Sequence, residues 1–145
     1  MEEHLKQKHV VRDWKGSKCN LTHCMKSEKS YDEAMSHVAP TNKKRTIETY
    51  LKLTYQRLVD GERLSGDSCP VREAGIQGTA DAGPGNGDIH YYAFKKKPIR
   101  SYFWYSPYEK GLVYVSHYRF KNYQKLDGKD TEQVRNNFFS HEVKK

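Results

Sequence analysis

The chain has 145 residues, of which 35% are hydrophobic, and it carries a formal net charge of +8. This length predicts one domain with at most a short appendage, and the low apolar share predicts a small core. No run of about 18 apolar residues is present and the first residues are charged, which argues against a membrane span and a signal peptide. Because the cysteines number three, a secreted disulfide framework is disfavoured and we expect a cytoplasmic protein.

Residues 1–29 are polar and predict either an N-terminal arm or a strand, with a strand over 9–14 as one option. We expect a single α+β domain over 30–145. Ser30, with Glu33 three residues later, has the spacing of a capping box and predicts a short helix over 30–38.

The next segment predicts the best-defined helix of the chain, over 42–60. Its apolar residues recur at the spacing of one helical face, and Gly61 is a natural stop. The stripe consists of Ile47, Tyr50, Leu51, Thr54 and Leu58.

Residues 64–88 are rich in Gly, Ser, Asp and Pro and predict a long flexible loop. A loop of this length in a small domain is unusual and is either functional or mobile. Its glycines do not predict a phosphate-binding loop, because no Gly-Lys-Ser/Thr follows them.

Three strands are expected after this loop, over 89–94, 99–105 and 112–119, since these runs are rich in β-branched and aromatic residues. The short connections between them predict antiparallel hairpins. A closing helix is expected from Asp130 or Thr131 as N-cap to about residue 139. The predicted fold is a small antiparallel sheet of three C-terminal strands, with a possible fourth from the N-terminus. Two helices from the N-terminal half and a short C-terminal helix pack on one side of it.

Positive charge and aromatic side chains are concentrated in the last third of the chain. Residues 91–145 contain 12 Lys/Arg against 5 Asp/Glu, and 14 of the 18 aromatic residues. Cations bind phosphates and flat rings stack on unpaired bases, so this region predicts binding to RNA or DNA. An acidic protein partner, or merely a solvated positive face, also fits this composition.

Strand alternation places the chemically active side chains. In the second predicted strand Arg100 and Tyr102 share one face. In the third, the same rule places His117 and Arg119 on the face of Val115. Because Arg100 begins its strand and the other two end the next one, antiparallel pairing is expected to bring these groups together at one end of the sheet.

Such a cluster can cleave RNA without a metal ion. The 2′-hydroxyl attacks the neighbouring phosphorus while a base takes its proton, an acid protonates the leaving 5′-oxygen, and cations stabilise the phosphate. His117 is the candidate base or acid, and Arg100 and Arg119 are candidate phosphate ligands. Tyr123 completes the candidate catalytic set. The candidate RNA-binding residues are Lys95, Lys96, Lys97, Tyr118, Lys121 and Lys125.

From about residue 42 to 140 the chain resembles the RelE/HigB-type toxins of bacterial toxin–antitoxin pairs. The resemblance rests on the cationic helix 43–58 and the extended loop that follows it. It continues with the segment 97–103, Lys-Pro-Ile-Arg-Ser-Tyr-Phe, and with the segment 112–121, which ends in His-Tyr-Arg-Phe-Lys.

Members of that family are small basic ribonucleases, many of which cleave mRNA on the ribosome, and a cognate antitoxin neutralises each of them. The resemblance implies the same activity here, with no cofactor. It assigns the family's strand arginine to Arg100 and its basic cluster to His117, Arg119 and Lys121. The family's tyrosine corresponds to Tyr118 or Tyr123.

Two other hypotheses remain open. One is a non-catalytic nucleic-acid- or protein-binding factor, of phage or mobile-element origin, on the same basic α+β domain. The other is a metal-dependent nuclease that uses Cys19, Cys24 and His23, since thiolate and imidazole bind zinc. The wide Cys-x4-Cys spacing, without a second pair, disfavours a metal site, as does the absence of a carboxylate cluster of the two-metal type.

Overall fold

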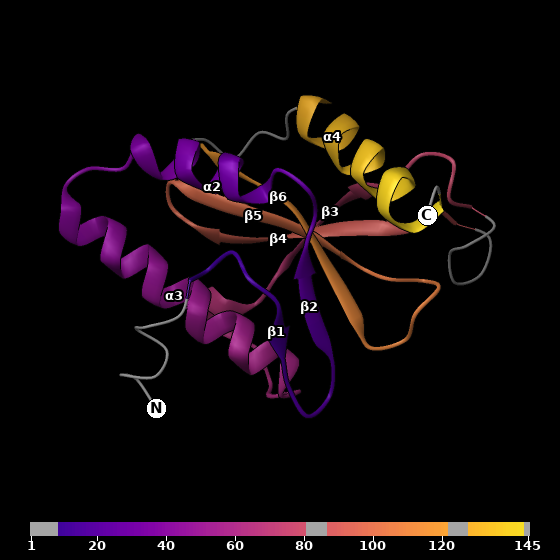
Figure 1. Cartoon of the computed structure of the whole chain (residues 1–145), viewed down its shortest axis with the longest axis horizontal. Helices are drawn as coiled ribbons and strands as arrows, with labels where there is room; N and C mark the ends of the chain where they lie inside the picture. The colour runs from indigo at the N-terminus through magenta and orange to yellow at the C-terminus, as the bar shows by residue number, and fades with distance from the viewer. Residues whose placement is uncertain (1–8, 81–86, 122–127, 144–145) are drawn as a thin grey trace.

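The computed structural model describes residues 9–80, 87–121 and 128–143, in which one sheet lies between helices (Figure 1). The strands are β1 (Trp14–Lys15), β2 (Asn20–His23), β3 (Val71–Gly75), β4 (His90–Lys96), β5 (Ile99–Tyr105) and β6 (Leu112–Phe120). The helices are α2 (Ser27–Ser36), α3 (Thr41–Val59) and α4 (Gly128–Phe138). Two single turns are also present, the 3-10 turn η1 (Gly66–Ser68) and the π-helical turn η2 (Phe139–Val143).

The strand order across the sheet is β1-β2-β6-β5-β4-β3. β2 lies parallel to β6, and the other neighbouring pairs are antiparallel. The expected α+β class is confirmed, and so are the three C-terminal strands and a further strand from the N-terminal region. β5 and β6 occupy the centre of the sheet, so the side chains of the predicted site belong to its most enclosed part.

Three element boundaries differ from the sequence prediction. The N-terminal strands are β1 and β2 rather than a strand over 9–14. The expected loop over 64–88 contains β3, whose few strand-forming residues take that conformation by pairing with β4. Helix α2 begins at Ser27, after Lys26 in a left-handed conformation with φ 71°. Ser30 is therefore an inner residue of α2, and its hydroxyl accepts a hydrogen bond from the backbone N–H of Tyr118 at 3.1 Å.

Helices cover both faces of the sheet. α2 and α3 pack on the face that carries Phe94 and Phe103, whose rings stack at 4.5 Å. α4 packs on the opposite face, where Val134 and Phe138 contact the cluster that contains Trp104. The prediction that all helices lie on one side is wrong for α4, because the alternate residues of β5 form a second apolar face that must be covered. Figure 1 shows α4, in yellow, on the other side of the strands from α3.

Helix α3 is close to the predicted span, but its buried face is rotated slightly. Ile47, Leu51 and Thr54 are buried as expected, and they are joined by Tyr55 and Val59. The β1–β2 connection closes the C-terminal end of this helix, because two of its backbone N–H groups donate to the Val59 carbonyl at 2.9 and 3.0 Å. A Cβ at Gly16 would lie 2.3 Å from that carbonyl, so only glycine allows this approach.

A β-bulge in β6 reverses the predicted faces of the strand. Tyr102 pairs with His117 while the next residue, Phe103, pairs with Val115, so Ser116 is the extra residue. A bulge of one residue moves every later side chain to the other face. His117 therefore faces α4, and the prediction that it shares the face of Val115 is wrong.

Within the described ranges, no helix combines the length and apolar character needed to cross a membrane.

Candidate active site

Two neighbouring strands bring the predicted cationic residues together. Arg100 of β5 lies directly opposite Arg119 of β6, and Tyr102 lies opposite His117. All four side chains project toward α4 because paired residues of adjacent strands share a face. The predicted convergence of Arg100, His117 and Arg119 at one end of the sheet is thus confirmed.

The carboxylate of Asp130, in the first turn of α4, lies at the centre of this group and is fully buried. Its Oδ1 lies 3.0 Å from His117 Nε2 and 3.4 Å from Arg119 Nε. Its Oδ2 lies 2.5 Å from Lys121 Nζ and accepts the Tyr102 hydroxyl at 3.3 Å. Four side chains thus bind one anionic group: Tyr102 from β5, His117 and Arg119 from β6, and Lys121 directly after β6. We call Asp130 and these four residues the Asp130 cluster.

The protonation states in the Asp130 cluster follow from burial and from these contacts. Burial lowers the pKa of His117 below its ordinary value, against the opposing effect of Asp130, so the imidazole is neutral at pH 7. Burial alone would raise the pKa of Asp130, but the hydrogen bonds from His117 and Lys121 outweigh it and hold that pKa below its usual range. Asp130 is therefore ionised, and the neutral imidazole donates its Nε2–H to it.

The other ring nitrogen of His117 has a partner as well. Nδ1 lies 2.8 Å from the Ser116 hydroxyl, which in turn lies 2.8 Å from the Asn137 side-chain amide. Since Nε2 carries the proton, Nδ1 accepts from Ser116, and Ser116 accepts from Asn137. Ser116 and His117 are each 1% exposed, so neither reaches solvent in this arrangement.

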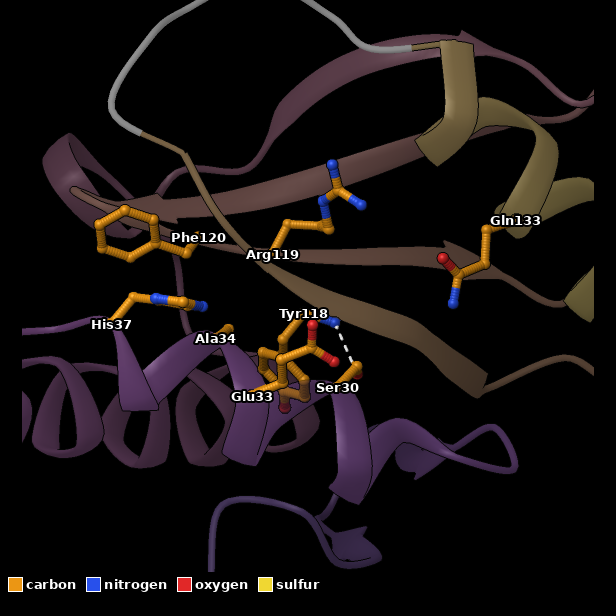
Figure 2. A pocket seen from close by; sticks show the side chains of 8 residues that line it. All are labelled: Ser30, Glu33, Ala34, His37, Tyr118, Arg119, Phe120 and Gln133. Atoms are coloured by element: carbon orange, nitrogen blue, oxygen red, sulfur yellow. Dashed lines mark hydrogen bonds between the residues drawn. The ribbon is translucent and has the colours of Figure 1, made fainter.

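Arg119 connects the Asp130 cluster with the surface. Its side chain is 35% exposed, whereas those of Lys121 and Asp130 are 1% and 0% exposed. It also lines a groove of about 420 Å³ between α2, the end of β6 and α4, which we call the α2–α4 groove. Figure 2 shows Arg119 between the two ends of this groove, with His37 and Phe120 at one end and Gln133 at the other.

The remaining predicted RNA-binding residues are not gathered at one place. Lys95 forms an ion pair with Glu73 of β3 at 3.0 Å, and Lys96 lies over the Tyr50 ring at 5.5 Å. Lys97 is exposed at the β4–β5 turn. Tyr123 and Lys125 lie outside the described residues.

Tyr118 does not have the expected role of a surface ring that stacks on a base, since it is 1% exposed and faces α3. Its hydroxyl lies 2.7 Å from the Tyr55 hydroxyl and 2.8 Å from His23 Nε2. Tyr55 lies 2.5 Å from Ser101 Oγ, and His23 Nδ1 lies 2.9 Å from the Arg12 carbonyl.

This second set of contacts forms a directed chain of hydrogen bonds. A carbonyl only accepts, so His23 Nδ1 donates to Arg12, and neutral His23 Nε2 accepts from Tyr118. Tyr118 then accepts from Tyr55, and Tyr55 accepts from Ser101. We call Ser101, Tyr55, Tyr118 and His23 the hydroxyl chain. Burial lowers the pKa of His23 to about 4, which keeps this imidazole neutral as well.

Asp130 and Tyr102 are the members of the Asp130 cluster that the sequence prediction did not include. Asp130 was expected only as a possible helix cap, whereas its carboxylate is directed at the sheet. The sequence does carry a signal for it, because an acidic residue on a helix shortly after His117, Arg119 and Lys121 is a natural partner for these groups.

The N-terminal cysteines and histidine do not form a metal site. Cys24 is buried, and burial raises the pKa of its thiol to about 12. Cys19 Sγ lies 3.5 Å from the Leu58 carbonyl, and both nitrogens of His23 have other partners. Among the residues with described placement, no group of three or more His, Cys, Asp or Glu side chains could hold a metal ion.

No protein-family model, curated protein or solved structure matches this chain.

Proposed function

We propose that this chain is a metal-independent endoribonuclease that cleaves mRNA in the cytoplasm and that an antitoxin protein neutralises it. The observation that carries the proposal is the position of the Asp130 carboxylate, held by His117, Arg119, Lys121 and Tyr102 at 2.5 to 3.4 Å. A phosphodiester presents the same negative charge and the same kind of acceptor oxygen, so these donors also suit a phosphate of RNA.

The reaction requires a base, an acid and stabilisation of charge. When Asp130 is displaced, the proton of neutral His117 moves to Nδ1, which donates to the Ser116 hydroxyl, and Nε2 becomes the base. Nε2 then takes the proton of the 2′-hydroxyl as the O2′–P bond forms, and Lys121 gives a proton to the 5′-oxygen as the P–O5′ bond breaks. Arg119 and Arg100 stabilise the charge that develops on the phosphate. The products are a 2′,3′-cyclic phosphate and a 5′-hydroxyl, and no oxidant or metal takes part.

Cleavage requires Asp130 to leave the cluster, because the carboxylate occupies the position of the phosphate. α4 is anchored at its other end, where Trp104 Nε1 donates to Glu142 at 2.9 Å and Ser106 Oγ donates to it at 2.6 Å. Phe138 is fully buried there too. Movement of the first turn of α4 therefore opens the site while the C-terminal end keeps its contacts. The formal net charge of +8 suits an acidic antitoxin.

The test is expression of the chain together with an assay of RNA cleavage in EDTA. Arg119→Ala is expected to abolish growth arrest and to reduce cleavage by at least about 100-fold, the loss typical of one charge-stabilising group. Lys110→Ala is the matched control, because it removes an exposed cation at the β5–β6 turn, away from the Asp130 cluster. Equal cleavage by the Arg119→Ala and Lys110→Ala proteins would refute the proposed site.

A second candidate function is a non-catalytic RNA-binding factor. It is favoured by the state of His117, which is 1% exposed and has partners at both ring nitrogens. The same assay distinguishes the two functions. If the chain is a binding factor, RNA incubated with the wild-type protein stays at full length. Arg119→Ala then weakens the binding of that RNA.

A further inference from the structure

The α2–α4 groove has the composition of a site for a nucleobase, an inference that rests on the proposed function. It is an open depression of about 420 Å³ with both apolar and polar walls. The walls come from α2, from the last residues of β6 and from α4, and Arg119 lies in the middle (Figure 2). Unlike the Asp130 cluster, the groove is accessible without movement of α4.

One end of the groove carries two rings. The centroids of His37 and Phe120 lie 5.4 Å apart, with their planes tilted by 48°. His37 is exposed at the C-cap of α2, and Phe120 is half-buried with one side packed on the core. A ring that is supported by the core on one side and open on the other is a stacking surface for a base.

The polar wall beside the rings favours a particular base. Within the described residues, the exposed Glu33 carboxylate has no hydrogen-bond or ion-pair partner, and it lines the groove together with the Gln133 amide. A carboxylate accepts two hydrogen bonds side by side. The Watson–Crick edge of guanine offers two adjacent donors, N1–H and the N2 amino group, whereas adenine presents the acceptor N1 there and uracil presents two carbonyls.

We propose that the α2–α4 groove binds a guanine base of the RNA. The base stacks on Phe120 and His37, and its Watson–Crick edge donates to Glu33. The phosphate attached to this nucleoside contacts the exposed part of Arg119, which is also a member of the Asp130 cluster. Bound RNA is thereby placed where its phosphate competes with Asp130, so recognition of the base and opening of the cleavage site are coupled.

The test measures binding apart from cleavage. Fluorescently labelled uridine pentanucleotides carry guanosine, adenosine or an abasic residue at the centre, with 2′-O-methyl groups that block the reaction. The wild-type protein is expected to bind the guanosine oligomer about tenfold more tightly than the abasic one, the usual effect of one stacked base. Phe120→Leu, which keeps an apolar side chain on the core, and His37→Ala are each expected to remove most of this difference.

Glu33→Gln tests the base assignment. It is expected to abolish the preference for guanosine over adenosine while affinity for the abasic oligomer stays unchanged. Glu28→Gln is the control, because it removes the same charge from the same helix outside the groove. Guanosine 3′-monophosphate is expected to displace the guanosine oligomer, and displacement by an acidic peptide alone would overturn the base site.

The possible failures are separable. Binding of all three oligomers with equal affinity overturns the base site and leaves the proposed cleavage intact. The absence of any RNA binding overturns the base site and the proposed function together. A loss of guanosine preference in Glu28→Gln as large as in Glu33→Gln would show a general effect of charge on α2, and it would overturn the role of Glu33.

Discussion

The two faces of β5 and β6 bury polar clusters of opposite kinds. On the side of α3 lies the hydroxyl chain, a line of neutral groups from Ser101 to His23. On the side of α4 lies the Asp130 cluster, in which cations surround one carboxylate. Neighbouring residues of β5 and β6 supply members to both sets, and α3 and α4 complete them from opposite sides.

The difference in charge between the two sets indicates that only the Asp130 cluster can exchange its carboxylate for another anion. In the hydroxyl chain Tyr55, Tyr118 and His23 each donate one hydrogen bond and accept another, so these groups are paired without an ion. The Asp130 cluster is completed by a carboxylate from a separate helix, and another anion can take that place. The hydroxyl chain is therefore expected to act in stability alone, and the Asp130 cluster in function.

Removal of the buried carboxylate is expected to have the largest effect on stability. Asp130→Ala leaves His117, Arg119 and Lys121 without their common partner and should lower the free energy of unfolding by about 3–5 kcal/mol. Urea denaturation at pH 7 measures this change. A cost below that of Tyr55→Phe would mean that the Asp130 cluster is not held together by charge.

Acidification is expected to have the next largest effect. The pKa of His23 is about 4 in the folded protein and 6.5 in the unfolded chain, so the unfolded chain binds the proton more readily. The stabilisation is complete above pH 6.5 and is lost as the pH falls toward 4, by about 3 kcal/mol from His23 alone. The lowered pKa of His117 acts in the same direction.

Unfolding curves between pH 7 and 4 test this prediction. In His23→Gln the free energy of unfolding should depend less on pH. The part of the pH dependence that arises from His117 should remain. The physical reason is that protonated His23 would donate from Nε2 and would force the hydroxyl chain to reverse. An unchanged pH dependence in His23→Gln would contradict the assigned direction of the chain.

A single break in the hydroxyl chain should have a smaller effect. Tyr55→Phe removes the hydroxyl between Ser101 and Tyr118 and is expected to cost about 1–3 kcal/mol, the penalty for buried polar groups that lose a partner. RNA binding should remain unchanged, because this face does not contain the site. Loss of RNA binding in a folded Tyr55→Phe protein would show that the two faces are not independent.

The smallest effects on stability are expected in the α2–α4 groove. Glu33→Gln and His37→Ala change exposed side chains and should alter the free energy of unfolding by no more than about 0.5 kcal/mol. Thermal unfolding followed by circular dichroism measures this. A larger loss would mean that these residues stabilise α2, and their effects on RNA binding would then need a different explanation.

Local patterns in the sequence predicted most of the central fold. The bounds of β5 and the approximate bounds of α3, β4 and β6 follow from apolar periodicity and from β-branched and aromatic residues. β3 was not predicted, because its conformation depends on pairing with β4 rather than on its own residues. The N-terminal strands β1 and β2 are too short for a local pattern to identify them.

The site was predicted only in part, for a related reason. The approach of Arg100 to Arg119 at one end of the sheet follows from strand order, and it was predicted. The bulge at Ser116 carries no local signal, so strand alternation placed His117 on the wrong face and left Tyr118 as a surface residue. Asp130 was not recognised because its contacts with β6 come from tertiary packing, which helix-capping patterns do not reveal.

The most direct test of the central claim compares the RNA affinity of wild-type protein and Asp130→Asn. This variant keeps the shape of the side chain and removes the charge that competes with a phosphate. Once circular dichroism shows that it is folded, it should bind RNA roughly tenfold more tightly than wild type. Addition of Arg119→Ala should remove that gain. Equal or weaker binding by folded Asp130→Asn would contradict the claim that the Asp130 carboxylate occupies the site of an RNA phosphate.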